Sequence, residues 1–279
     1  MKRILFILAA VTILSLPERA YAQELPFADG EKLQYTIHYK CGFSADLAQL
    51  TLEGKAEGPD YHLIANISTF RFWDSFFRIR DIYETKFRNE PGLQPVYFHR
   101  DIQEGNYWAK NWFNWTQDAS SVHAVIEKKT RPRRDTTYRE NGVIRDIFNL
   151  IYLCRAADYE QLEAGRPVKS IMTLDRDLFD ITVRYIGREK KKVGNTTYNT
   201  VKLGIAIKSR NVDLSEGTSS LTIASDSSEY DGSEKLFFWI SDDDNRVPVV
   251  FSSSLSVGSI RGRLVSVEGN AHPLTSIVK

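Results

Sequence analysis

Alternation of apolar and polar residues is the dominant pattern of this chain from residue 33 onward. In residues 33–40, Leu33, Tyr35, Ile37 and Tyr39 fall on one face of an extended strand. Similar segments follow, separated by turns rich in Gly, Pro, Asn and Asp. The pattern predicts strands over 33–40, 45–54, 61–69, 79–87, 96–100, 106–116, 122–128, 135–138, 168–173, 179–187, 197–207, 235–240, 247–253 and 259–268.

Residues 143–157 change the period. The apolar positions recur at i, i+3, i+4, i+7 and i+8, at Ile144, Ile147, Phe148, Ile151 and Tyr152. That spacing predicts one α-helix over about 143–157. A mainly β chain with one helix favours a curved antiparallel sheet that forms a barrel or half-barrel, with the helix covering it. Residues 209–233, rich in Ser, Thr, Asp and Gly, are typical of a long surface loop.

The first 22 residues have the pattern of a secretory signal peptide. Lys2 and Arg3 precede an apolar run over 4–16, and Ala20-Tyr21-Ala22 forms an A-x-A cleavage site before Gln23. The run is too short for a stable membrane anchor, and no cysteine follows the cleavage site. We therefore expect an exported, periplasmic protein of the cell envelope that does not span the membrane, with residues 23–279 forming a single β-rich domain.

Charge and cysteine content bear on nucleic-acid binding, disulfide formation and metal binding. The 37 basic and 36 acidic residues nearly cancel, so no overall charge attracts nucleic acid. Export permits a disulfide between the two cysteines, Cys41 and Cys154; the alternative is two free thiols. A zinc site needs more ligands than two cysteines supply, and we expect no metal or cofactor.

Four segments stand out as a recognisable set: Phe27 to Leu33 with Tyr35-Thr36-Ile37, Arg145 to Arg155, Tyr185 to Glu189, and Phe238 to Asp243 with Arg246 to Val249. In this order they resemble the DUF3108 family of exported bacterial proteins. The resemblance covers nearly the whole chain after the signal peptide. It implies a β-rich envelope protein, loosely similar in architecture to the half-barrels that carry lipoproteins and hold acyl chains. The family is one of unknown function, so the resemblance implies no reaction.

Aromatic residues supply the main candidates for a binding site. In a strand over 106–115, Tyr107, Phe113 and Trp115 share one face, and Trp108 and Trp112 share the other. Such residues either stack on sugars and line a cavity for an acyl chain, or form the core of a central strand. Residues 70–77, which include Trp73, raise the same two alternatives.

Charged segments supply weaker candidates. Residues 242–245 have the oxygen-bearing side chains of a calcium loop but suit a hairpin turn better. Asp175, Asp177 and Asp180 share that ambiguity. The basic residues in 128–134 suit anionic lipid head groups or a phosphorylated glycan, although a solvated turn has the same composition.

Catalytic motifs of the common hydrolases and nucleotide-binding enzymes are absent from the sequence, and we assign no catalytic residue. A Cys–His pair or two carboxylates would have to assemble in space. Our leading hypothesis is a non-enzymatic envelope protein that holds an apolar or amphipathic ligand, such as lipid or cell-wall glycan, in the concave face of the sheet. The alternatives are an envelope scaffold that binds a protein partner and a hydrolase of envelope polymers.

Overall fold

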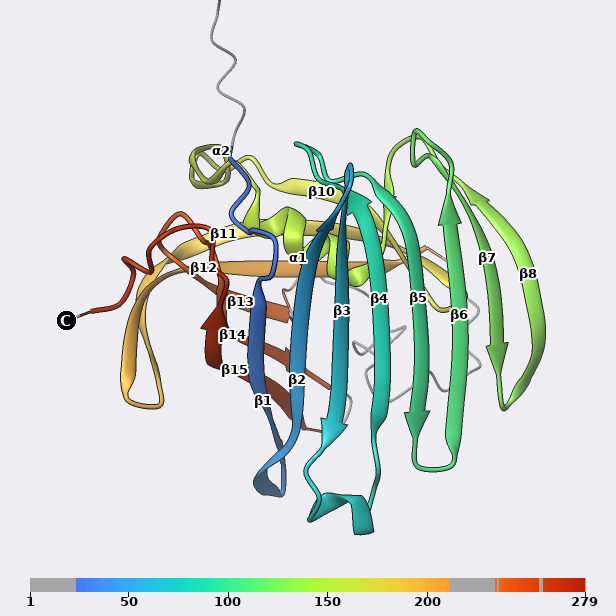
Figure 1. Cartoon of the computed structure of the whole chain (residues 1–279), viewed down its shortest axis with the longest axis horizontal. Coiled ribbons are helices and arrows are strands. Elements are labelled where there is room, and N and C mark those ends of the chain that lie inside the picture. The colour runs from blue at the N-terminus through green and yellow to red at the C-terminus, as the bar shows by residue number, and fades with distance from the viewer. Residues whose placement is uncertain (1–23, 211–233, 235, 256–257, 279) are drawn as a thin grey trace, which may run out of the picture.

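The computed structural model describes residues 24–210, 234, 236–255 and 258–278 (Figure 1). The expected signal peptide (1–22) and nearly all of the expected loop (209–233) lie outside these residues. The strands are β1 (Lys32–Cys41), β2 (Phe43–Glu57), β3 (Asp60–Thr69), β4 (Arg80–Arg88), β5 (Pro95–Glu104), β6 (Tyr107–Trp115), β7 (Ser121–Lys128), β8 (Arg131–Arg139), β9 (Ile144–Arg145), β10 (Val168–Leu174), β11 (Asp177–Val193), β12 (Thr196–Ser209), β13 (Leu236–Ser241), β14 (Pro248–Ser254) and β15 (Ser259–Glu268). The helices are the 3₁₀ turn η1 (Trp73–Ser75), α1 (Ile147–Arg155) and α2 (Tyr159–Glu163).

All fifteen strands belong to one sheet, in the order β8-β7-β6-β5-β4-β3-β2-β1-β15-β14-β13-β12-β11-β10-β9. β1 to β8 form an antiparallel meander, the curved wall at the front and right of Figure 1. β10 to β15 form a second meander, joined to the first by the β1–β15 pair, and β11 and β12 pass behind the first wall. The predicted mainly β, curved antiparallel sheet is therefore confirmed. It is a half-barrel, because β8 and β9 remain as edges.

Side chains bind the β8 edge to the turn between β10 and β11. The Tyr138 hydroxyl donates to the Arg176 carbonyl at 2.8 Å, and Arg176 Nη2 donates to the Pro132 carbonyl at 2.6 Å. At this edge the two meanders therefore approach one another through side chains, whereas the β1–β15 ladder joins them at the other side.

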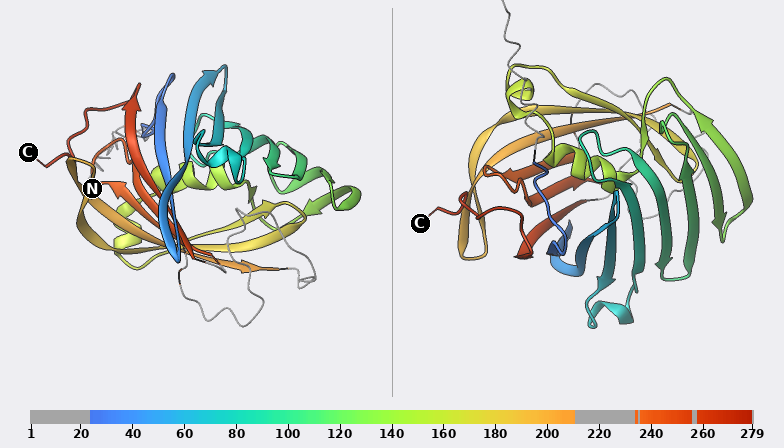
Figure 2. Two further views of the ribbon diagram at one scale, coloured as in Figure 1. Left: turned by 90° about the horizontal axis from the view of Figure 1, so that it is seen from below. Right: turned by 45° about the horizontal axis from the view of Figure 1, so that its top comes forward.

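Helix α1 lies between the two meanders and contacts β4 and β10 (Figure 2). Phe148 and Tyr152 belong to the core of the first wall, whereas Leu150 and Cys154 belong to a second core under β10 to β13. A helix covered on both sides buries more than one stripe of side chains. The interior of the half-barrel is therefore occupied by the helix and its two cores.

The predicted helix over 143–157 is wrong at its start. Ile144 and Arg145 form β9, which pairs in parallel with Ile171 and Met172 of β10. The Asp146 carboxylate then accepts hydrogen bonds from the backbone N–H groups of Phe148 and Asn149, an N-cap that begins the helix at residue 147. A second, five-residue helix, α2, follows and was not expected.

Candidate functional site

Four alternate turns of the first meander lie at the same end of the wall, the lower end in Figure 1. They are residues 40–43, 70–80, 105–106 and 129–130. We call the aromatic side chains at this end the aromatic rim: the exposed Phe43, Phe70, Phe72, Phe76 and Phe77 and the partly buried Trp73. In an antiparallel meander every second turn reaches the same edge. The rim is therefore assembled from segments that are distant in the sequence.

Hydrogen bonds join these turns to one another. Trp73 Nε1 donates to the Asp46 carbonyl of β2 at 2.8 Å. The Gly105 N–H donates to the Arg78 carbonyl at 2.7 Å, and Lys129 Nζ donates to the Asn106 carbonyl at 2.7 Å. Hydrogen bonds thus connect the last three turns in series and tie the loop 70–80 to β2, and a ring contact between Phe43 and Trp73 adds the first turn.

The rim exposes rings to solvent that a fold would normally bury. Phe76 is 73% exposed, Phe72 68% and Phe43 52%. Trp73 holds them together, because Phe72 and Phe43 lie 5.0 Å and 6.2 Å from its ring centroid to centroid. Contiguous exposed apolar groups of this kind mark interaction surfaces on soluble proteins.

The loop under the rim has its own polar support. Arg80 forms an ion pair with Asp74 at 2.5 Å, and Thr69 Oγ1 donates to the same carboxylate. The Arg80 hydrogen bond, together with Thr69, lowers the pKa of Asp74. The N–H groups of Phe76 and Phe77 both donate to the Trp73 carbonyl at 2.9 Å. These bonds fix the loop with its phenylalanines turned outward.

The six residues singled out for ligand binding do not form one site. On β6, Phe113 is fully buried and Trp115 donates its Nε1 to the Ile144 carbonyl at 2.6 Å, so this face belongs to the core. Tyr107 is packed against the same core. Trp112 lies on the outer face, stacked on His99 at 5.3 Å, and Trp108 is 39% exposed. Of the six residues, the rim contains Trp73.

Side chains pack the concave face of the first wall. Tyr61, Phe87, Phe98 and Phe113 are at most 1% exposed there, and neighbouring rings such as Phe98 and Phe113 lie 5.8 Å apart.

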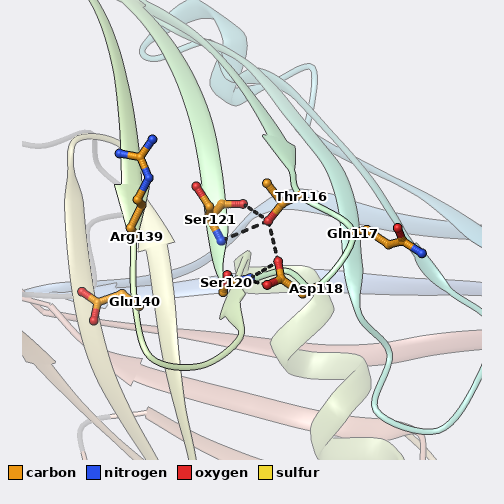
Figure 3. A pocket seen from close by; sticks show the side chains of 7 residues that line it. All are labelled: Thr116, Gln117, Asp118, Ser120, Ser121, Arg139 and Glu140. Carbon is orange, nitrogen blue, oxygen red and sulfur yellow. Dashed lines mark hydrogen bonds between the residues drawn. The ribbon is translucent and has the colours of Figure 1, made fainter.

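A hollow of about 780 Å³ lies at the end of the wall opposite the aromatic rim, at the turn between β6 and β7 (Figure 3). Its lining is polar: Thr116, Gln117, Asp118, Ser120, Ser121, Arg139 and Glu140. Asp118 accepts bonds from Thr116 and Ser120 there, which is ordinary turn chemistry.

A buried ion pair lies at the heart of the structure. Arg155 of α1 donates to both carboxylate oxygens of Glu31 at 2.6 Å, and both side chains are fully buried. Tyr152 also donates to Glu31 at 3.0 Å, and the Asn245 carbonyl accepts from Arg155 at 3.0 Å. The pair joins the segment before β1, helix α1 and the turn between β13 and β14. These residues therefore have a structural role.

A second buried charge cluster lies just inside the rim. Lys128 and Arg100 both contact Asp175 in the turn between β10 and β11, the latter at 3.5 Å. Lys128, one of the basic residues expected at a solvated turn, is therefore buried and paired. Nearby, burial raises the pKa of Asp81 to about 7, assisted by Glu104. The carboxyl group of Asp81 accepts from the Gln103 N–H at 2.9 Å.

The remaining candidates are structural. In residues 242–245, Asp243 accepts from Ser241 Oγ at 2.8 Å and from the Asn245 N–H at 3.1 Å, which forms a hairpin turn. No cluster of three or more His, Cys, Asp or Glu suited to a metal occurs among the described residues. The disulfide is not formed: Cys41 is a free thiol at the end of β1, and Cys154 is a free thiol buried on α1.

One hydrogen-bonded chain resembles catalytic machinery. On the β1–β2 hairpin, His38 Nε2 lies 2.8 Å from Ser44 Oγ, and His38 Nδ1 lies 2.8 Å from Asp46 Oδ1. This is the order of contacts in a serine hydrolase triad. Asp46 also binds Arg263 at 2.6 Å, and Ser44 is exposed on a strand. No sequence motif marks this group, because its residues meet only through the pairing of β1 with β2.

Comparison with known proteins identifies a family. The model of the family described as "Protein of unknown function (DUF3108)" matches residues 34–265. No curated protein matches the chain. A crystal structure from Brucella abortus, described as a β-barrel-like protein of a domain of unknown function, DUF1849, aligns with a TM-score of 0.49 and 10% sequence identity, over 87% of this chain and 98% of that chain. Within the part of the chain that the structure describes, no helix is long and apolar enough to cross a membrane. The match over residues 34–265 shows that this chain belongs to the DUF3108 family.

Proposed function

We propose that this protein is a non-enzymatic binding protein of the bacterial cell envelope whose amphipathic ligand is lipid, bound at the aromatic rim. The observation that carries the proposal is the exposure of Phe72 and Phe76 beside Trp73. Export by the segment 1–22 is part of the proposal and would place the rim among envelope lipids.

The chemistry of the rim favours lipid over glycan. Sugar sites combine a ring face with polar groups that bind hydroxyls. The rim has five phenylalanines, which offer no hydrogen bond, and the Trp73 N–H is already bound to Asp46. Phenylalanine and tryptophan on one face are typical of groups that enter the boundary between lipid head groups and acyl chains.

The packing of the interior supports a ligand site outside the half-barrel. Phe87, Phe98 and Phe113 fill the concave face, and α1 lies across it. The expected guest in the concave face would have to displace these rings. Lipid binding at the rim requires no such rearrangement, so the rim replaces the interior as the proposed site.

Cosedimentation of the exported protein with vesicles of bacterial polar lipids tests this function. We expect the wild type to bind and the double variant Phe72→Ser/Phe76→Ser to lose at least about tenfold in affinity. The matched control is Ile186→Ser/Val265→Ser, which changes side chains that are 46% and 63% exposed on other strands. Equal binding by the wild type and the Phe variant, or no binding by the wild type, would contradict the proposal.

The Ser44–His38–Asp46 contacts favour a second candidate function, hydrolysis of an ester or amide in the envelope. In that case Ser44 Oγ would attack the carbonyl carbon while His38 takes its proton. A fluorophosphonate probe distinguishes the two functions, because it labels an activated serine. Labelling of the wild type that disappears in Ser44→Ala would establish the hydrolase; an unlabelled wild type leaves these residues as a surface hydrogen-bonded chain.

A further inference from the structure

Basic residues outnumber acidic ones in the turns that form the aromatic rim. Between the strands, the four turns at this end (residue 42, 70–79, 105–106 and 129–130) contain three basic residues, Arg71, Arg78 and Lys129, and one acidic residue, Asp74. Asp74 is already paired with Arg80. Lys40, Arg71, Arg78 and Lys129 are exposed, and none forms an ion pair with another described residue.

The opposite end of the same wall has a different composition. Its turns, 58–59, 89–94 and 116–120, contain two acidic residues, Glu90 and Asp118, and no basic or aromatic residue. The wall thus has one cationic, aromatic end and one weakly acidic, polar end. A protein that is nearly neutral overall therefore carries a local asymmetry along its strands.

The bonds between the turns place cations and rings on one surface. Arg78 is held beside the β5–β6 turn through the Gly105 N–H, and Lys129 is held to Asn106 of that same turn. Phe77 lies against Gly105, where a Cβ would approach its ring to 3.2 Å. The β7–β8 turn and its basic residues are thereby coupled to the phenylalanines, although about fifty residues of sequence separate them.

Resting on the proposed function, we propose that the rim docks on the surface of an anionic bilayer. The phenylalanines enter the head-group region while Arg71, Arg78 and Lys129 contact lipid phosphates. In this arrangement the first wall stands with its strands pointing toward the membrane and its acidic turns away from it. Each Lys or Arg near an anionic surface contributes about a fivefold gain in partitioning, and salt weakens this gain.

The test compares phosphatidylcholine vesicles with vesicles in which part of the lipid is phosphatidylglycerol. We expect the wild type to bind the anionic vesicles more tightly, with affinity falling as salt is added. The triple variant Arg71→Gln/Arg78→Gln/Lys129→Gln should lose about 100-fold on anionic vesicles and little on neutral ones. The control Lys55→Gln/Arg139→Gln/Arg166→Gln removes three exposed charges away from the rim and should behave as the wild type.

The possible outcomes distinguish docking on an anionic bilayer from lipid binding at the rim in general. Equal affinity for both vesicle types, with no effect of the triple variant but loss in Phe72→Ser/Phe76→Ser, overturns the anionic surface and leaves lipid binding intact. If neither variant loses binding, both the docking on an anionic bilayer and the lipid-binding function of the rim are contradicted. Self-association of the wild type that Phe72→Ser/Phe76→Ser abolishes would show that a second copy covers the rim, which also overturns the inference.

Discussion

Two aromatic groups in this molecule have similar composition and opposite surroundings. Around α1, the rings of Phe27 and Tyr152 lie against Arg155, whose charge is neutralised by Glu31, and every member of the group is buried. At the rim, Phe72 and Phe76 lie against Trp73 in solvent, next to an exposed Arg71 without a carboxylate partner among the described residues. The first group is complete within the chain. In the second, the rings of Phe72 and Phe76 stay exposed, and Arg71 has no carboxylate partner within the described part of the chain.

Aromatic content alone therefore does not locate a binding site in this chain. Three of the segments that carry the family resemblance meet at the buried group: Glu31 comes from the first, Arg155 from the second, and Asn245 lies between the two parts of the last. The remaining one adds Arg188, which binds both Glu163 and Asp242, at 2.5 and 2.9 Å. The resemblance therefore follows residues that build the fold, whereas the rim lies between those segments.

The largest effect is expected from breaking the buried pair. Glu31→Gln keeps an acceptor for Tyr152 but leaves Arg155 charged and buried without a counter-ion. We expect a loss of about 3–5 kcal/mol in the free energy of unfolding. Urea denaturation measures it, with Lys32→Gln as the control, because its pair with Glu53 is exposed at the surface. A change of similar size in the two variants would show that the buried group is not what holds α1.

The stability cost of removing a phenylalanine ring should differ between the buried group and the rim. Phe87→Ala removes a ring that is 0% exposed and should cost about 3–5 kcal/mol. Phe76→Ala removes one that is 73% exposed and should change stability by less than about 0.5 kcal/mol. Thermal unfolding of both variants gives the contrast. A strongly destabilised Phe76→Ala would mean that the rim holds the fold together and is not free for a partner.

A smaller effect on stability is expected from the buried carboxyl groups of Asp81 and Asp146. Burial raises the pKa of Asp81 to about 7 and that of Asp146 to about 6, above their values in the unfolded chain. The folded state therefore binds these protons more tightly, and its stability decreases as pH rises from about 4 to 7. Asp81→Asn retains the acceptor for the Gln103 N–H. Between low and high pH, the free energy of unfolding of this variant should fall by about 1–3 kcal/mol less than that of the wild type. Urea midpoints at pH 5 and pH 8 test it; parallel profiles for both proteins would contradict the assignment.

The alternation of apolar and polar residues predicts most of the strands. Leu33 and Tyr35 are 1% exposed, as alternation over 33–40 predicts, and β6 presents Phe113 inward and Trp108 outward. The helix start was missed because Ile144 fits the helical phase, yet its backbone pairs with β10. That pairing is long-range, and local periodicity contains no information on it.

The site was only partly predictable. Residues 70–77 stand out because five of the eight residues are aromatic, and Trp73 is among the candidate ligand-binding residues. The inclusion of Phe43, and the approach of Lys129 to the same surface, depend on turns that meet in space through Asp46 and Asn106. Burial of Lys128 likewise depends on Asp175, 47 residues away.

The central claim is that the rim enters a lipid surface, and Cys41 offers a direct probe of it. Cys41 lies partly exposed next to the rim, whereas Cys154 is 1% exposed and burial raises its pKa to about 12, so a maleimide dye labels Cys41 selectively. An environment-sensitive dye at Cys41 should shift to the blue and brighten when vesicles containing phosphatidylglycerol are added, and brominated lipids should quench it. A dye on Ser120→Cys in a Cys41→Ser background, at the opposite end of the wall, should not respond. An unchanged spectrum at Cys41, or equal responses at both ends, would contradict the account.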